Sequence, residues 1–140
     1  MFNWREYYSL ARKQLSQADS IPKDETPQKE AVLRSAASRA YYAAYHRACD
    51  YLRKVKSYPT DQETKAGGKG SHQLIIDIFI NDDSHPGWEE IGTMLWRLKG
   101  FRHWADYEEY GTHVFTNTNE VKERIDLAEE IIKRIDSLKV

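Results

Sequence analysis

The stretch "RSAASRAYYAAYHRACDYL", residues 34–52, decides the fold, because small alanines alternate there with tyrosines, arginines and a histidine. Its small residues fall on two neighbouring ridges at helical spacing: Ala36, Ala40 and Ala44 in one, and Ala37, Tyr41, Ala44 and Ala48 in the other. Ridges of small residues let a second helix approach closely, and the tyrosines fill space while keeping a hydroxyl for a hydrogen bond. The pattern predicts a central, tightly packed helix from about Thr26 to Lys56.

Further helices are predicted around this one. Two segments repeat apolar or small residues at steps of 4, 3, 4 and 3, the pattern of one helical face. They are Trp4, Tyr8, Ala11, Leu15 and Ala18 near the start, and Val121, Ile125, Ala128, Ile132 and Ile135 near the end. The segment "HQLIIDIFI", residues 72–80, is ambiguous by period, but no other segment offers it a partner strand, so we expect a short buried helix. Another helix is expected from Pro86 to Tyr110, and Asn117 is expected to cap the last one. The predicted fold class is all-α, an up-and-down bundle of four to five helices.

Length and composition limit the classes of protein to which this chain can belong. A chain of 140 residues predicts one domain, residues 1–140, with a flexible polar loop at about 57–71. The formal net charge of -1 means that any nucleic-acid site is a local patch. No apolar run approaches the length of a membrane span, so no membrane partner is expected. One cysteine excludes an internal disulfide, and without a signal-peptide core the sequence predicts a cytoplasmic protein.

The residues able to carry chemistry fall into two groups. The five histidines form no metal-binding motif, and no phosphate-binding or dinucleotide glycine pattern is present, so we expect neither a metal nor a cofactor. The first group is Arg39 with His46, which are seven residues apart and share a helical face. Arginine binds phosphate through its fork, and histidine moves protons near neutral pH. The alternative is structural: the arginine pairs with a carboxylate, and the histidine is held by a tyrosine hydroxyl.

The second group lies in "LKGFRHWADYEEY", residues 98–110. Arg102 and Asp106 have the spacing of a helical ion pair. Cations and aromatic rings alternate around them: Arg97, Lys99 and Arg102 among Trp96, Phe101 and Trp104. A basic patch with aromatic residues suits RNA, whose unpaired bases stack on rings. The alternative places the tryptophans in the core and the charges on a solvated face.

The strings "SRAYYAAYHRA", "SHQLIIDIF" and "LKGFRHWADYEEY" together resemble the small HEPN-domain proteins of bacteria and archaea, over about residues 5–138. HEPN stands for higher eukaryotes and prokaryotes nucleotide-binding. The resemblance implies a four- to five-helix bundle that forms a homodimer. It also implies a toxin-type protein that acts on RNA without a metal and is encoded beside a minimal nucleotidyltransferase antitoxin.

Ribonucleases of that family carry an arginine, four to six residues, and then a histidine. When the motif is aligned on Arg102, Tyr107 stands in the place of that histidine. Two hypotheses follow: a metal-independent endoribonuclease, or a non-catalytic module that dimerises and binds nucleotide, RNA or a nucleotidyltransferase. The site residues that the first hypothesis implies are Arg102 as phosphate clamp, His46 or His103 as proton carrier, Arg39 as second cation, Tyr107 as hydrogen-bond donor and Asp106 as competitor of the RNA phosphate. We expect Arg39, His46 and Arg102 to point into one polar cleft at the dimer interface.

Overall fold

The computed structural model describes residues 3–22, 24–56, 71–82, 84–107, 115 and 117–138. These residues form helices and no strand. In chain order the helices are α1 (Trp4–Asp19), α2 (Thr26–Lys56), α4 (Ser71–Asn81), α5 (Trp88–Tyr107) and α6 (Thr118–Asp136). The prediction of an all-α bundle is therefore confirmed. Within these ranges no helix has the length and apolar character needed to cross a membrane.

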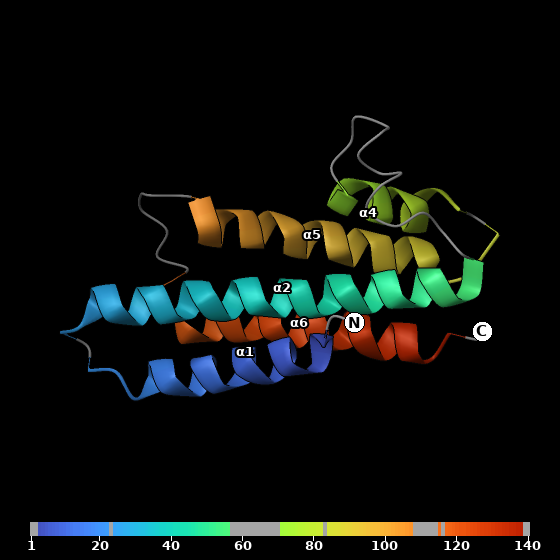
Figure 1. The fold of residues 1–140 in the computed structure, drawn as a ribbon. Helices are drawn as coiled ribbons and strands as arrows, with labels where there is room; N and C mark the ends of the chain where they lie inside the picture. The colour runs from blue at the N-terminus through green and yellow to red at the C-terminus, as the bar shows by residue number, and fades with distance from the viewer. Residues whose placement is uncertain are drawn as a thin grey trace.

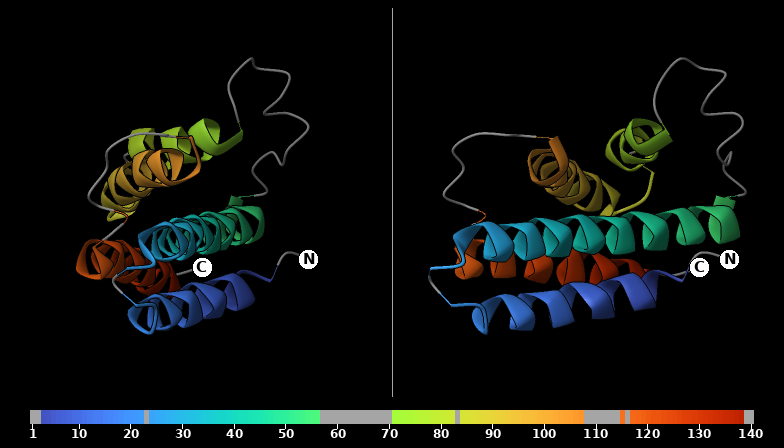
Figure 2. Two further views of the ribbon diagram at one scale, coloured as in Figure 1. Left: turned by 90° about the vertical axis from the view of Figure 1, so that its left-hand side faces the viewer. Right: turned by 60° about the vertical axis from the view of Figure 1, so that its left-hand side comes forward.

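Helix α2 is the longest and lies at the centre of the bundle (Figure 1). It packs against all four other helices, with α1 and α6 on one side and α5 on the other. Helices α1, α2, α5 and α6 alternate in direction, and α4 lies on α5 away from α1 (Figures 1 and 2). The arrangement is an up-and-down bundle of four helices with one short helix added.

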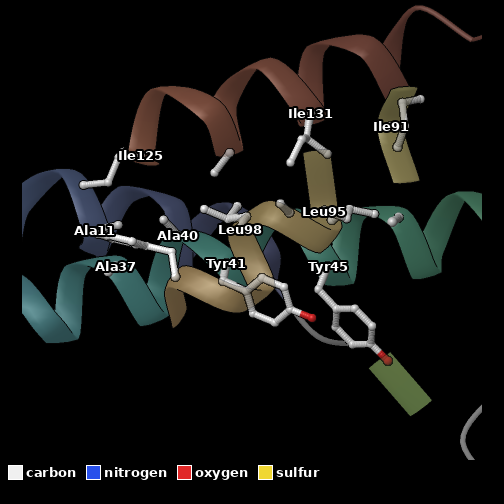
Figure 3. Packing of buried hydrophobic residues seen from close by; sticks show 14 of the residues in the cluster. Ala11, Ala37, Ala40, Tyr41, Tyr45, Ile91, Leu95, Leu98, Ile125 and Ile131 are labelled. Carbon is white, nitrogen blue, oxygen red and sulfur yellow. The ribbon is translucent and has the colours of Figure 1, made fainter. Parts of the chain in front are cut away.

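The alanine ridges explain the central place of α2. Ala36, Ala40 and Ala44 have no exposed surface, and Tyr41 beside them is equally buried. Side chains from several helices converge on them, as Figure 3 shows for Ala11 of α1, Leu95 and Leu98 of α5, and Ile125 and Ile131 of α6. Because alanine adds only a methyl group to the backbone, the neighbouring helices approach closely without leaving voids.

The segment expected to be a short buried helix is α4. Its residues Ile75, Ile76 and Phe79 are buried. Helix α5 meets α4 at Gly92, where an added Cβ would lie 2.6 Å from Cγ1 of Ile80 and 3.0 Å from its backbone nitrogen. The absence of a side chain at Gly92 thus permits the close contact of α4 with α5.

The start of α5 differs from the prediction. The helix begins at Trp88 instead of Pro86, because Gly87 has a φ of 89°, in the left-handed region where glycine is favoured. The backbone nitrogen of Trp88 donates to the carbonyl oxygen of His85 at 3.3 Å, which closes a turn. Asn117 caps α6 as expected, accepting a hydrogen bond from the backbone nitrogen of Asn119 at 2.9 Å. The predicted continuation to Tyr110 and residues 57–70 of the predicted loop lie outside the described residues.

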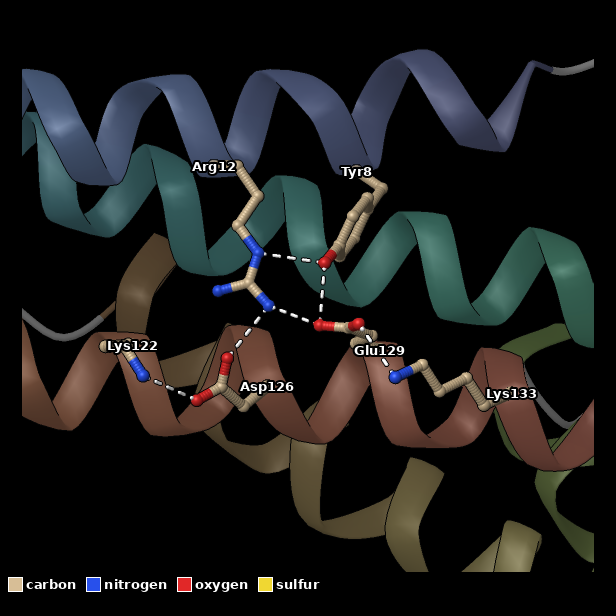
Figure 4. Close-up of polar contacts among 6 residues, drawn as sticks. All are labelled: Tyr8, Arg12, Lys122, Asp126, Glu129 and Lys133. Carbon is tan, nitrogen blue, oxygen red and sulfur yellow. Dashed lines mark hydrogen bonds and ion pairs between the residues drawn. The ribbon is translucent and has the colours of Figure 1, made fainter.

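A polar network joins α1 to α6 (Figure 4). The Nη2 of Arg12 lies 2.6 Å from Oε2 of Glu129 and 2.8 Å from Oδ1 of Asp126. The hydroxyl of Tyr8 donates to Glu129 at 2.9 Å and accepts from Nε of Arg12 at 2.8 Å. Hydrogen bonds from Tyr8 and Lys133 lower the pKa of Glu129, and those from Lys122 and Arg12 lower the pKa of Asp126. Both carboxylates therefore remain charged partners of Arg12 at neutral pH.

Candidate nucleic-acid interface

Helix α5 has an apolar inner face and an aromatic outer face. The inner face buries Leu95 and Leu98 in the core. On the outer face the exposed fractions are 58% for Trp96, 47% for Trp104 and 64% for Tyr107. The alternative that Trp96 and Trp104 belong to the core is therefore wrong, and large apolar rings are presented to solvent in a row along one helix.

A hollow of about 630 Å³ lies on this outer face. Trp96 and Trp104 line it together with Gly100, Phe101 and His103. Four residues of permanent positive charge also line it: Arg97, Lys99 and Arg102 from α5, and Arg124 from α6. No carboxylate is among the described residues that line it. The predicted run of cations among aromatic rings thus forms one surface that suits an anionic ligand carrying flat rings.

Arg102 stands between this hollow and α2. Its Nη1 lies 3.2 Å from Oδ2 of Asp106, and its side chain is 12% exposed. The guanidinium carbon lies 5.3 Å from the ring centroid of Tyr41 and 5.4 Å from that of Tyr42, within range of cation–π attraction. Burial acts to lower the pKa of Arg102, but the hydrogen bond to Asp106 and the nearby Tyr42 act more strongly, so the pKa is raised. Arg102 is a fixed, permanent cation.

Arg39 lies beside α1, away from the hollow on α5. Its guanidinium carbon is 5.7 Å from the ring centroid of Tyr7 on α1, and Arg39 lines a separate hollow with Glu6 and Lys13. Across the described ranges, the recorded neighbours of Arg39 belong to α1 and those of Arg102 to α2 and α5. Within one chain Arg39 and Arg102 line separate hollows and share no described cleft. Their expected meeting at a dimer interface stays a prediction. Spacing along α2 correctly aligns Arg39 with His46, but it does not determine which neighbouring helix each side chain leans toward.

His46 is linked to Arg102 through the ring of Tyr42. Its ring centroid lies 5.0 Å from that of Tyr45 and 6.3 Å from that of Tyr42. The ring of Tyr42 in turn faces Arg102. His46 therefore belongs to an aromatic cluster beside Arg102, with one tyrosine ring between them.

Sequence reasoning did not single out His72, which the structure places in the same cluster. The ring of His72 stacks on that of Tyr45 with centroids 3.9 Å apart and an angle of 3° between the planes. Its Nδ1 lies 2.7 Å from the hydroxyl of Tyr41. A histidine in the first turn of a short helix was the only signal in the sequence, and nothing in the spacing indicated which tyrosines lie opposite it.

His103 and Tyr107 lie on the outer face of α5, with ring centroids 4.8 Å apart. Arg102 points instead toward α2, because consecutive helical residues do not share a face. Oδ2 of Asp106 forms an ion pair with Arg102. The hydroxyl of Ser38 donates to the same oxygen at 3.5 Å. In the part of the chain that the structure describes, no three His, Cys, Asp or Glu side chains are grouped to hold a metal ion. The arrangement is suited to stacking flat rings and attracting phosphates.

Comparison of the chain with protein-family models, with curated proteins and with solved structures finds no significant match.

Proposed function

We propose that this protein is an RNA-binding protein of the HEPN toxin type and that RNA binds in the hollow on the outer face of α5. The observation that carries the proposal is the pair of exposed tryptophans set among four permanent cations. Stacking of one base on an aromatic side chain contributes about 1–3 kcal/mol and tolerates any sequence. Arginine and lysine supply the attraction for the phosphates between the bases.

The distribution of charge favours a nucleic acid over an acidic protein surface. The whole chain has a formal net charge of -1, yet Arg97, Lys99, Arg102 and Arg124 gather at one hollow. Arginine near exposed indoles offers both a phosphate partner and a planar stacking surface. An acidic protein patch would use the charges but would leave the faces of Trp96 and Trp104 without matching rings.

Metal-independent cleavage of RNA is the second candidate, supported by the permanent charge of Arg102. Cleavage needs a cation for the pentavalent phosphate and a group that moves protons. In this candidate Arg102 holds the phosphate and His46 or His103 moves the proton, with Tyr107 donating a hydrogen bond. The ion pair of Arg102 with Asp106 opposes it, so we place RNA binding first and cleavage second.

The resemblance to HEPN proteins supports two protein partners within this proposal. One is a second copy of the chain, and the other is a minimal nucleotidyltransferase that acts as an antitoxin in the cytoplasm. Sedimentation at tens of micromolar protein tests the first partner, since a single species of 16.4 kDa would contradict the homodimer.

The binding proposal is tested by titrating a fluorescein-labelled unstructured RNA and recording its fluorescence anisotropy. Trp96→Ala and Trp104→Ala are each expected to weaken binding by about tenfold or more, from the loss of one stacked base. Leu10→Ala is the matched control, because Leu10 is an exposed apolar residue, at 39%, on α1. Affinity should also fall as salt rises, less steeply in Arg97→Ala than in Lys13→Ala. Equal affinity of both tryptophan variants and the wild type would contradict the proposal.

Cleavage is tested separately by incubating the same RNA with the protein in EDTA. Loss of cleavage in Arg102→Ala, with the fold retained, supports the second candidate. Intact RNA with the wild-type protein leaves binding as the function and removes the enzymatic candidate.

A further inference from the structure

Two glycines lie within α5, and only one has a structural reason to be glycine. At Gly92 a Cβ would lie 2.6 Å from the Ile80 side chain, so packing against α4 requires the small residue. At Gly100 a Cβ would meet nothing within 4 Å, and the position is exposed. Nothing in the packing of the described residues therefore requires a glycine at position 100.

Glycine in the middle of a helix is also unfavourable. It loses more backbone freedom on folding than any other residue, whereas alanine is the best helix former. Helix α5 runs through Gly100 without interruption, with twelve of its residues before Gly100 and seven after it. An alanine would fit and would stabilise the helix, so the packing of the described residues gives no reason for a glycine here.

Gly100 lies at the floor of the hollow that the proposed function uses. Trp96 and Trp104 are each four residues away, and Arg97 and His103 are each three away, so all four side chains stand around the bare backbone. With a rise of 1.5 Å per residue, the two indoles are attached about 12 Å apart along the helix axis. The hollow is thus a gap over exposed backbone with one indole at either end.

We propose that Gly100 is the contact point for a single-stranded RNA segment that runs along α5, with its sugar–phosphate chain against the helix backbone. The two flanking bases stack on Trp96 and Trp104. The proposal rests on the proposed function, since it names the form of RNA that the same hollow accepts. A side chain at position 100 would stand where the strand passes.

The spacing of the two indoles favours single-stranded RNA over a duplex. Bases stacked in a duplex are about 3.4 Å apart and hide their faces from side chains, whereas the two indoles are separated by about 12 Å. Reaching both requires an extended strand whose bases are splayed apart, as in recognised single-stranded RNA. A mononucleotide reaches one indole only, so the shortest ligand that uses the whole hollow has two or more nucleotides.

The test compares Gly100→Ala and Gly100→Gln with the wild type, by melting temperature and by affinity for a labelled uridine heptamer. Both variants are expected to melt a few degrees higher. Affinity should fall about threefold for alanine and tenfold or more for glutamine, whose longer side chain fills the gap. Ser16→Ala on α1 is the matched control, because it improves an exposed helical position far from the hollow and should change the melting temperature alone.

The outcomes separate this inference from the proposed function. Wild-type affinity in Trp96→Ala and Trp104→Ala overturns the proposed function and this inference together. Loss of affinity in the tryptophan variants with wild-type affinity in Gly100→Gln overturns the inference alone. Competition with unlabelled RNA gives a second decision: a duplex or uridine monophosphate that competes as well as the heptamer contradicts the extended single strand.

Discussion

The phenolic oxygen of Tyr41 on α2 lies 2.7 Å from Nδ1 of His72 on α4, so a hydrogen bond joins the central helix to the first turn of the short one. Tyr45, one turn further along α2, stacks on the same imidazole ring. Burial raises the pKa of Tyr41, which keeps its hydroxyl protonated and able to form this bond across the neutral range. A hydrogen bond and the packing of His72 against tyrosine rings of α2 thus help to hold α4 to α2.

Replacement of Tyr41 by phenylalanine removes the hydroxyl and keeps the buried ring. We expect the free energy of unfolding to fall by about 1 kcal/mol, the usual contribution of one such hydrogen bond. Urea unfolding followed by circular dichroism measures the change. Tyr42→Phe is the matched control, since the contacts recorded for Tyr42 involve its ring. A loss of the same size in both variants would show that the bond to His72 contributes nothing specific.

The two glycines of α5 should respond to alanine with opposite signs. Gly92→Ala places a Cβ 2.6 Å from Cγ1 of Ile80, and overpacking of this kind costs about 1–3 kcal/mol. Gly100→Ala meets no atom and should stabilise the protein by roughly 0.5–1 kcal/mol. Thermal unfolding of the two variants side by side gives the comparison. A gain in melting temperature for Gly92→Ala would mean that α4 does not pack against α5 as closely as described.

The contact of α1 with α6 should weaken in acid. The pKa values of Asp126 and Glu129 are lowered in the folded protein. Each carboxylate therefore gives its full stabilisation above the ordinary carboxyl pKa of about 4, and this stabilisation is lost as the pH falls through the lowered value. Arg12→Gln should cost about 1 kcal/mol at neutral pH, because exposed ion pairs are weak. In acid strong enough to protonate both carboxyl groups, its effect should shrink to that of the lost side-chain packing. An equal cost at both pH values in urea unfolding would contradict the assignment.

Asp106 should oppose RNA binding by occupying Arg102. Asp106→Asn removes the charge that holds Nη1 of Arg102 and keeps the shape of the side chain. We expect the affinity for RNA to rise about fivefold, or roughly 1 kcal/mol, the upper range for a partly exposed ion pair. Asp19→Asn makes the same change in net charge at the exposed end of α1 and should leave affinity nearly unchanged. Anisotropy titrations at one salt concentration compare the three proteins, and equal affinities would show that Asp106 does not compete with phosphate.

Local pattern was enough to predict the helices but not their neighbours. The spacing of Ala36, Ala40 and Ala44 predicted a central helix because ridges of small residues have few uses other than close packing. The expectation that Pro86 begins α5 was wrong by two residues, because the sequence does not reveal the positive φ of Gly87.

Contacts within one helix made part of the candidate site predictable, as they did the helices. Arg102 and Asp106 are one turn apart, so their ion pair followed from the sequence. The exposure of Trp96 did not, because α5 carries apolar residues around its whole circumference and its periodicity points to no single face. Partners on other helices, such as Tyr7 for Arg39 and Tyr41 for His72, depend on how the helices are placed in space.

The different surroundings of the tryptophans give the protein its own optical reporters. Trp96 and Trp104 are exposed to water, whereas Trp88 is buried in the core. Solvated indoles emit at longer wavelengths than buried ones, and a stacked nucleobase quenches their emission. Once the partly exposed Trp4 of α1 is replaced by phenylalanine, the red edge of the emission spectrum follows occupancy of the hollow, and the blue edge follows the integrity of the core. An unlabelled sample can thus separate loss of binding from loss of fold in a single spectrum.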